Sequence, residues 1–276
     1  ALIQTSAHAR PLVLEEQVKL TLPDTSFTCC GRVAISGNTL LVTGSKEGPP
    51  EQGPGSVVQA AFVFERNAAG QWQFVTQLVE ETHDPVGGVT PISVAINGSL
   101  AAVALRRVYV FRRTTSGWTS VPSTALAGNS TDVEADAGRF VVSDGGCGYD
   151  ANLVQAQADG SYANVHRFMG AIRDDGCDDE FLGGDVDISG NRVVLGGPET
   201  YVYTEATGGW SGVRVPPSAA PTVFGDRVTI HNGTLLASAP ETQGGPYIFL
   251  PPYQQNSGNL TRPDALNVGR FDRIEL

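Results

Sequence analysis

The chain has 276 residues, a formal net charge of -11 and a sequence pI near 4.7. It has no basic stripe to neutralise phosphates, which argues against nucleic-acid binding, and its only lysines, Lys19 and Lys46, are too few for a polybasic membrane anchor. No apolar run approaches the roughly 20 residues of a membrane-spanning helix, so we expect no membrane insertion. The length suits one large all-β domain or two ordinary domains, and a sequence repeat favours a single domain over residues 1–276.

A short phrase recurs along the chain: an alternating apolar segment, a Gly/Asn turn, and a more continuous apolar segment. It is first complete at residues 33–44 and returns at residues 94–98, 133–138, 186–190 and 228–233. The starts are separated by about 40 to 60 residues, the upper end of the spacing found in propeller blades and solenoid units. The repeat therefore predicts a ring or stack of similar units.

Each unit is predicted to contain four strands. Val186-Asp187-Ile188 is typical of a short first strand, and residues 192–197 of a second strand buried on both faces. The third strand is aromatic and β-branched, as at residues 62–64, 108–111, 201–203 and 247–249. The fourth follows a glycine and contains Trp72, Trp118 or Trp210. Short, evenly spaced strands with one aromatic signature per unit predict a β-propeller.

The two ends of the chain add a further unit. Residues 271–276 are similar to the first strand at residues 225–230, and residues 11–16 and 18–22 are similar to third and fourth strands. Together they would complete one blade and remove the open edge of the ring. We therefore predict six four-stranded blades with one blade split between the N- and C-termini. Five or seven blades remain as alternatives.

The repeat resembles the FG-GAP family, the blade type of the integrin α-subunit propeller. Phe224-Gly225-Asp226 matches the FG part, and Gly196-Gly197-Pro198 and Ser238-Ala239-Pro240 approximate the GAP part. The resemblance implies an extracellular binding propeller. The family's calcium loop, D-x-D-x-D-G, is missing, so calcium does not follow from the resemblance. The acidic loops suggest one candidate cofactor, a divalent cation such as calcium, and no other cofactor is predicted.

Sequons and cysteines indicate a secreted protein. Four N-x-Ser/Thr sequons predict glycosylation at Asn97, Asn129, Asn232 and Asn259. Asn97-Gly98 and Asn232-Gly233 also fit the central pair of a tight type I′ turn. The four cysteines lack metal-site spacing and favour disulfides.

Propeller topology predicts the cysteine pairs. Cys147 follows a second strand and Cys177 follows a fourth strand, so their loops would emerge on the same face and suit a disulfide. Cys29 and Cys30 are placed in the loop before the first complete repeat. They would form a strained bridge with each other, or one of them would reach Cys147 or Cys177.

The same face gathers polar residues that we take as the candidate binding site. They lie beside the cysteines or in neighbouring loops: Cys29, Cys30, Glu47, His83, Asp84, Asp144, Tyr149, Asp150, Asp174, Asp175, Asp178 and Asp179. Such groups suit sugar hydroxyls, a divalent cation or a cationic partner. A solvated acidic rim is the alternative, and it is favoured for any single carboxylate.

The function that these features favour is a secreted, non-catalytic recognition or adhesion propeller that binds an extracellular glycan or protein through its loop-rich face. We expect it to be a monomer. The three tryptophans are interpreted as blade-packing residues. No nucleophile elbow, P-loop or H-E-x-x-H motif occurs, and no catalytic residue is assigned. The alternative is a carbohydrate-active enzyme, a polysaccharide lyase or glycoside hydrolase, with an axial active site.

Overall fold

The computed structural model describes residues 19–83, 93–105, 107–122, 132–144, 150–169, 185–197, 200–215, 225, 227–238, 247–251 and 253. Within these ranges the chain forms β-strands and one short 3-10 helix. The strands make five separate antiparallel sheets, four with four strands and one with three. The all-β prediction is therefore confirmed.

Every sheet is built from strands that are consecutive in the chain. The first contains β1 (Thr28–Ser36), β2 (Thr39–Glu47), β3 (Val57–Arg66) and β4 (Trp72–His83), with the helix η1 (Pro50–Gln52) between β2 and β3. The second contains β5 (Ser93–Asn97), β6 (Leu100–Ala104), β7 (Val108–Thr114) and β8 (Gly117–Val121). The third contains β9 (Val133–Asp136), β10 (Arg139–Asp144), β11 (Asp150–Ala156) and β12 (Tyr162–Phe168). The fourth contains β13 (Val186–Ser189), β14 (Arg192–Leu195), β15 (Thr200–Ala206) and β16 (Gly209–Val215), and the fifth β17 (Val228–His231), β18 (Thr234–Ala237) and β19 (Tyr247–Phe249).

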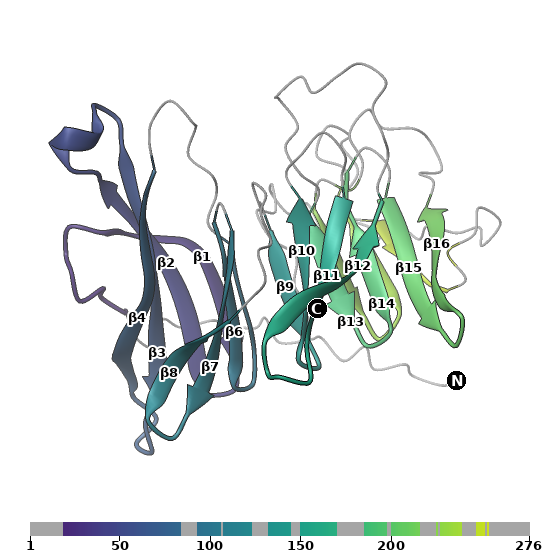
Figure 1. Ribbon diagram of the computed structural model, residues 1–276, viewed down its shortest axis with the longest axis horizontal. Helices are drawn as coiled ribbons and strands as arrows, with labels where there is room; N and C mark the ends of the chain where they lie inside the picture. Colours follow the sequence, from purple (N-terminus) through teal and green to yellow (C-terminus); the bar gives the residue numbers. More distant parts are fainter. Residues whose placement is uncertain are drawn as a thin grey trace, which may run out of the picture.

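The first strands of successive sheets contact one another. β1 contacts β5, β5 contacts β9, β9 contacts β13, and β13 contacts β17. The fourth strand of each four-stranded sheet lies at the opposite edge from the first, and Figure 1 shows the sheets standing side by side. Sheets that meet at their first strands and radiate outward form a β-propeller.

Apolar side chains fill the space between neighbouring sheets. Val94 and Ile96 of β5 pack against Ala61 and Val63 of the first sheet. The next three interfaces repeat this arrangement, with cores that include Phe140, Leu153 and Val202. Because strand side chains alternate, the apolar positions of each first strand face the preceding sheet and leave the other positions to face the next one.

One strand prediction is wrong in its described part. Residues 19–22 were expected at the end of a fourth strand, but they form no strand. Leu22 and Phe27 are instead buried against the face of the first sheet that carries Val42 and Phe62. The segment crosses this apolar face because covering it removes more apolar surface from water than pairing at an edge would.

The described sheets do not decide the blade number. Residues 1–18 and 254–276, on which the sixth blade depends, lie outside the described ranges. Val33 and Ile35 of β1 are 44% and 58% exposed on the face directed away from the second sheet. A further sheet at this position would cover them, so six blades stays a prediction.

The glycines that carried the FG-GAP resemblance meet between the fourth and fifth sheets. A Cβ on Gly196 would overlap the carbonyl oxygen of Gly225, and a Cβ on Gly225 would overlap Oγ1 of Thr200. Gly225 is also held by its N–H, which donates to the carbonyl of Ser238 at 2.7 Å. The two motifs therefore mark a backbone approach that admits only glycine.

The two sequon turns differ from each other. Asn232 and Gly233 have φ values of 48° and 83°, as the central residues of a type I′ turn require. Asn97 is the last residue of β5, and the turn is formed by Gly98 and Ser99. The type I′ prediction for Asn97-Gly98 is thus wrong: the strand continues through Asn97, which pairs with Leu100, and of the two turn residues only Gly98 has a positive φ, 60°.

We predict that Gly196→Ala lowers the free energy of unfolding by about 1–3 kcal/mol, the usual cost of inserting an atom into a packed contact. Gly208→Ala is the matched control, because a Cβ there meets nothing within 4 Å. Chemical denaturation of both variants measures the difference. Equal stabilities would show that the Gly196–Gly225 approach is not a constraint.

Candidate functional site

The described candidate residues lie at one end of the sheets, which we call the loop-bearing end. Glu47, the last residue of β2, is aligned with Val57 of β3, which is aligned with His83, the last residue of β4. Asp144 and Asp150 pair with each other where β10 and β11 are connected. These residues share the end from which the connections to β3, β11 and the next sheet leave, the upper end in Figure 1. Asp84, Tyr149, Cys147, Cys177, Asp174, Asp175, Asp178 and Asp179 lie outside the described residues.

Cys29 and Cys30 were expected in a loop, but they lie near the start of β1. Cys29 pairs with Gly44 of β2, and the register shifts between Cys29 and Val33. The strand extends past the repeated phrase because this bulge lets it follow the long β2. Cys29 is disulfide-bonded. Its partner is not described, so both proposed pairings stay predictions.

Asp150 is not part of a solvated acidic rim. It is 6% exposed, and its carboxylate forms an ion pair with Arg167 of β12. Asn152 is the residue aligned with Arg167, so the pair spans a diagonal of the sheet that the sequence does not reveal. Asp150 therefore stabilises the third sheet and is unsuited to bind a partner directly.

The first sheet carries the most exposed acidic groups of the described loop-bearing end. Glu47 and Glu51 are exposed, at the end of β2 and in η1. Lys46 lies next to Glu47, but its ammonium group is paired with Asp24 at 3.2 Å and Glu80 at 3.5 Å. The negative charge of Glu47 and Glu51 is thus left open to solvent.

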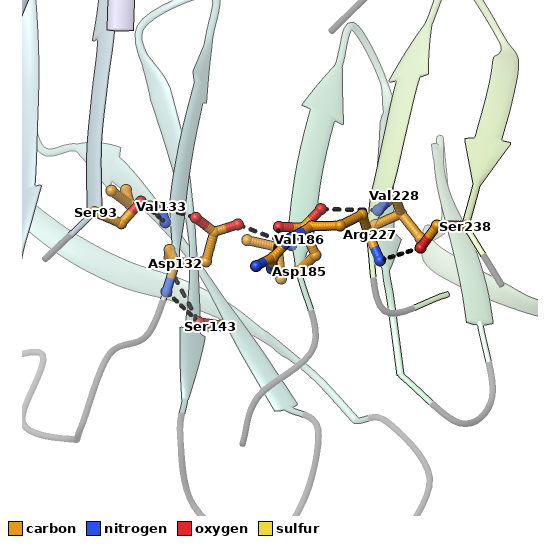
Figure 2. Close-up of polar contacts among 9 residues, drawn as sticks. All are labelled: Ser93, Asp132, Val133, Ser143, Asp185, Val186, Arg227, Val228 and Ser238. Atoms are coloured by element: carbon orange, nitrogen blue, oxygen red, sulfur yellow. Dashed lines mark hydrogen bonds and ion pairs between the residues drawn. The ribbon is translucent and has the colours of Figure 1, made fainter. Parts of the chain in front are cut away.

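A second polar group, which the sequence analysis missed, lies along the inner strands. Asp132 precedes β9, and its carboxylate joins three sheets (Figure 2). Oδ1 accepts the hydroxyl of Ser93 at 2.8 Å, and Oδ2 accepts the N–H of Val186 at 3.1 Å. Its own N–H donates to Oγ of Ser143 at 2.7 Å, which fixes the backbone in front of β9.

The fourth sheet repeats this arrangement toward the fifth. Asp185 accepts the N–H of Val228 at 2.8 Å and forms a 3.5 Å ion pair with Arg227. Asp187 accepts the hydroxyl of Thr229 and the N–H of Ile230, both at 2.7 Å. We call Asp132, Asp185 and Asp187 the inter-sheet aspartates. They satisfy N–H groups on inner edge strands that have no further strand to pair with.

Burial shifts the pKa values of two inter-sheet aspartates upward. For Asp185 desolvation is the main cause, the nearby charge of Asp132 adds to it, and the pKa lies well above its usual value. For Asp187 desolvation raises the pKa to about 6, although its hydrogen bonds from Thr229, Ile230 and Ile188 oppose the shift. Such shifts also occur at catalytic sites, but here the carboxylate oxygens are occupied by bonds that hold the sheets together.

The sequence did contain a signal for this network. The polar residues alternate with the apolar ones in the first strands, as in Val186-Asp187-Ile188-Ser189. The backbone N–H groups that donate to Asp185 and Asp132 lie 43 and 54 residues away, in the next sheet. Alternation predicts which face they occupy, whereas their partners require the arrangement of the sheets.

Within the described ranges no group of three His, Cys, Asp or Glu side chains is arranged to hold a metal ion.

The three tryptophans pack on the sheets. Trp118 and Trp210 are partly buried against the cores between sheets, and Trp72 against the outer face of the first sheet. The packing interpretation of the tryptophans is therefore confirmed.

Comparison with known proteins identifies no family for this chain. No model of a known protein family matches the sequence, and no curated protein does. Among solved structures the chain is similar to the WD40 domain of Pan2 from Neurospora crassa, with 12% identity and a TM-score of 0.46. The match covers 79% of this chain and 74% of that one. The propeller assignment rests on the sheet order and inner-strand contacts described above.

No helix in the described residues is long and apolar enough to cross a membrane.

We predict a specific pH dependence from Asp187. Its folded pKa of about 6 lies above the ordinary value of 3.8, so the folded state binds this proton more tightly than the unfolded chain. The stability that Asp187 contributes is therefore present at low pH and falls as pH rises from about 4 to about 6, by roughly 1.4 kcal/mol per unit of pKa difference.

The test compares wild type with Asp187→Asn by urea denaturation between pH 4 and pH 8. The variant cannot lose this proton, so its stability relative to wild type is expected to rise between pH 4 and 6 and then level off. Subtracting the two curves removes the contribution of the other carboxyl groups. A difference that stays flat or falls over this range would contradict the assignment.

Proposed function

We propose that this chain is a secreted, non-catalytic recognition propeller that binds an extracellular glycan or protein at its loop-bearing end. The observation that carries the proposal is the register. It brings Glu47, His83 and the start of β1 in the first sheet, and Asp144 in the third, to the same end of their sheets, although they are far apart in sequence. Connections that vary in length on a rigid scaffold are where binding residues concentrate.

The first sheet projects beyond the second at this end. β2 has nine residues and the equivalent β6 has five, while both start directly after their turns. At 3.4 Å per residue the four additional residues extend the sheet by about 14 Å. The projection ends in η1 and exposes Glu47 and Glu51, so we propose it as the first contact for a partner with basic or hydroxyl groups.

The sequons agree with this orientation. Asn97 and Asn232 lie at the turns between first and second strands, at the end of the sheets opposite the loop-bearing end. Asn232 is exposed. Glycans at these positions would leave the loop-bearing end free for a partner. Asn129 and Asn259 lie outside the described residues.

The alternative function is a carbohydrate-active enzyme. None of the described residues favours it. Glycoside hydrolysis needs two carboxyl groups free to exchange protons with substrate. The inter-sheet aspartates bond to Ser93, Val186, Val228 and Ile230 instead.

The proposal is tested with labelled protein on arrays of glycans and extracellular protein domains, with and without a chelator. The double variant Glu47→Gln/Glu51→Gln is expected to weaken the signal several-fold, because exposed charges contribute up to about 1 kcal/mol each. The chelator arm shows whether a divalent cation takes part.

The matched control is Ala68→Lys/Thr207→Lys. It changes the net charge by the same amount at exposed turn residues of the opposite end. Signals that fall equally in both variants would indicate non-specific electrostatics. Absence of any binder on either array would contradict the proposal.

A further inference from the structure

An arginine of the third sheet is paired with a glutamate of the fourth. Arg139, the first residue of β10, places Nη1 2.8 Å from the carboxylate of Glu205, and its Nη2 donates to the carbonyl of Gly190. The side chain of Arg139 is 16% exposed and that of Glu205 is 43% exposed. The carboxylate therefore reaches the guanidinium from the solvent side.

Arg192 has the equivalent position one sheet further along the chain. It is the first residue of β14, as Arg139 is of β10. Because strand side chains alternate, it shares the face of Val194, which packs toward the fifth sheet. A Cβ placed on Gly233, in the turn of the fifth sheet, would lie 3.3 Å from Nη1 of Arg192 and 3.5 Å from its Cζ. Arg192 thus reaches the fifth sheet as Arg139 reaches the fourth.

The fifth sheet has no glutamate at the position that corresponds to Glu205. Glu205 lies opposite Asn191, and its N–H donates to the carbonyl of Asn191 at 2.8 Å. The register of the fifth sheet places Pro251 at this position, opposite Gly233. Proline offers neither a carboxylate nor an N–H, and the carbonyl of Gly233 accepts the hydroxyl of Tyr253 instead.

The guanidinium of Arg192 is left without a counter-charge. Within the described part of the chain it forms no ion pair, and its Nε is buried without a hydrogen-bond partner. The side chain as a whole is half-buried. A charge that is partly withdrawn from water is stabilised when a partner replaces the lost solvation, and a guanidinium can hold a carboxylate by two parallel hydrogen bonds.

We propose that Arg192 binds a carboxylate supplied by another molecule, in the way that Arg139 holds Glu205. The internal ion pair shows that a carboxylate on a side chain fits such a position. The site lies at the end of the sheets opposite the loop-bearing end, so it is independent of the proposed partner-binding surface. The net charge of -11 repels an acidic ligand at long range, so recognition depends on contacts at the guanidinium itself.

The test is a titration of the intact chain followed by two-dimensional NMR. It is done at about 0.15 M salt, where charges more than about 8 Å apart are largely screened. The probes are N-acetyl-glutamate methylamide, its glutamine analogue as the neutral control, and sodium acetate. The glutamate probe is expected to shift the resonances of Arg192 and Gly233 at tens of millimolar, whereas the glutamine probe leaves them unchanged.

The acetate arm identifies the source of the carboxylate. Tighter binding of the glutamate probe than of acetate supports an acidic side chain of a partner protein as the ligand. Equal binding of the two supports a free small carboxylate at the same guanidinium.

Arg192→Gln is expected to weaken binding of the glutamate probe about tenfold, because it removes a charge-assisted hydrogen bond. Lys19→Gln is the matched control. It removes the same charge at an exposed residue of the segment that crosses the first sheet, so affinity should not change. Thermal unfolding of both variants checks that the sheets remain folded.

Pro251→Glu tests the comparison with Glu205 directly. It supplies the carboxylate from within the chain, so the glutamate probe should bind about tenfold more weakly than to Pro251→Gln, which changes the same position without the charge. The melting temperature of Pro251→Glu should also exceed that of Pro251→Gln, because the new ion pair joins the fourth and fifth sheets.

Three results would overturn the proposal. One is the absence of any shift at Arg192 and Gly233, and another is equal binding of the glutamate and glutamine probes. The third is unchanged affinity in Arg192→Gln, since the carboxylate would then bind elsewhere.

Discussion

Each inner strand of this propeller has backbone N–H groups that no further strand can pair. The preceding sheet supplies the acceptors. Asp132 bonds to Val186, Asp185 bonds to Val228, and Asp187 bonds to Ile230. Other side chains do the same near the turns, where Ser36 accepts the N–H of Gly98 and Asp136 that of Gly190. An unpaired buried N–H would cost about 1–3 kcal/mol, so these contacts are a condition for bringing the sheets together.

These hydrogen bonds give the ring a direction. In a first strand the apolar positions pack back on the preceding sheet, and the polar positions bond forward to the next. A sheet can therefore not be exchanged with its neighbour without losing both sets of contacts. Burying carboxylates for this purpose raises the pKa values of Asp185 and Asp187, because their charged forms lose water. The strength of the inner network thus depends on the protonation of the carboxyl groups that join the sheets.

The sequence predicts the elements well because each strand is defined by its own residues. The third and fourth strands expected at residues 201–203 and 210–213 lie within β15 and β16. The glycines on which the resemblance to FG-GAP repeats rested were visible as well, and the structure shows that Gly225 and Gly196 approach each other between sheets.

Apart from the local register at Asn97 and the start of β1, the errors concern partners that are distant in sequence. Asp150 was expected on a solvated rim because Arg167 lies 17 residues further along the chain. Residues 19–22 were expected in a strand because their apolar pattern suits one, whereas they cover the face of the first sheet. The inter-sheet aspartates were missed for the same reason. Local pattern shows which face a side chain occupies, but its partner depends on the packing of whole sheets.

The two ends of the propeller are constrained differently. At the turn end, residues such as Gly98, Gly190 and Asn232 are bonded to the preceding sheet, so these turns are short and their positions fixed. At the loop-bearing end, the described connection between β2 and β3 is long enough to form η1. The ion pair of Glu65 with Arg113 adds a further contact between the first and second sheets near the turn end. The hydrogen bonds to the turns and this ion pair therefore fix how closely neighbouring sheets approach at that end.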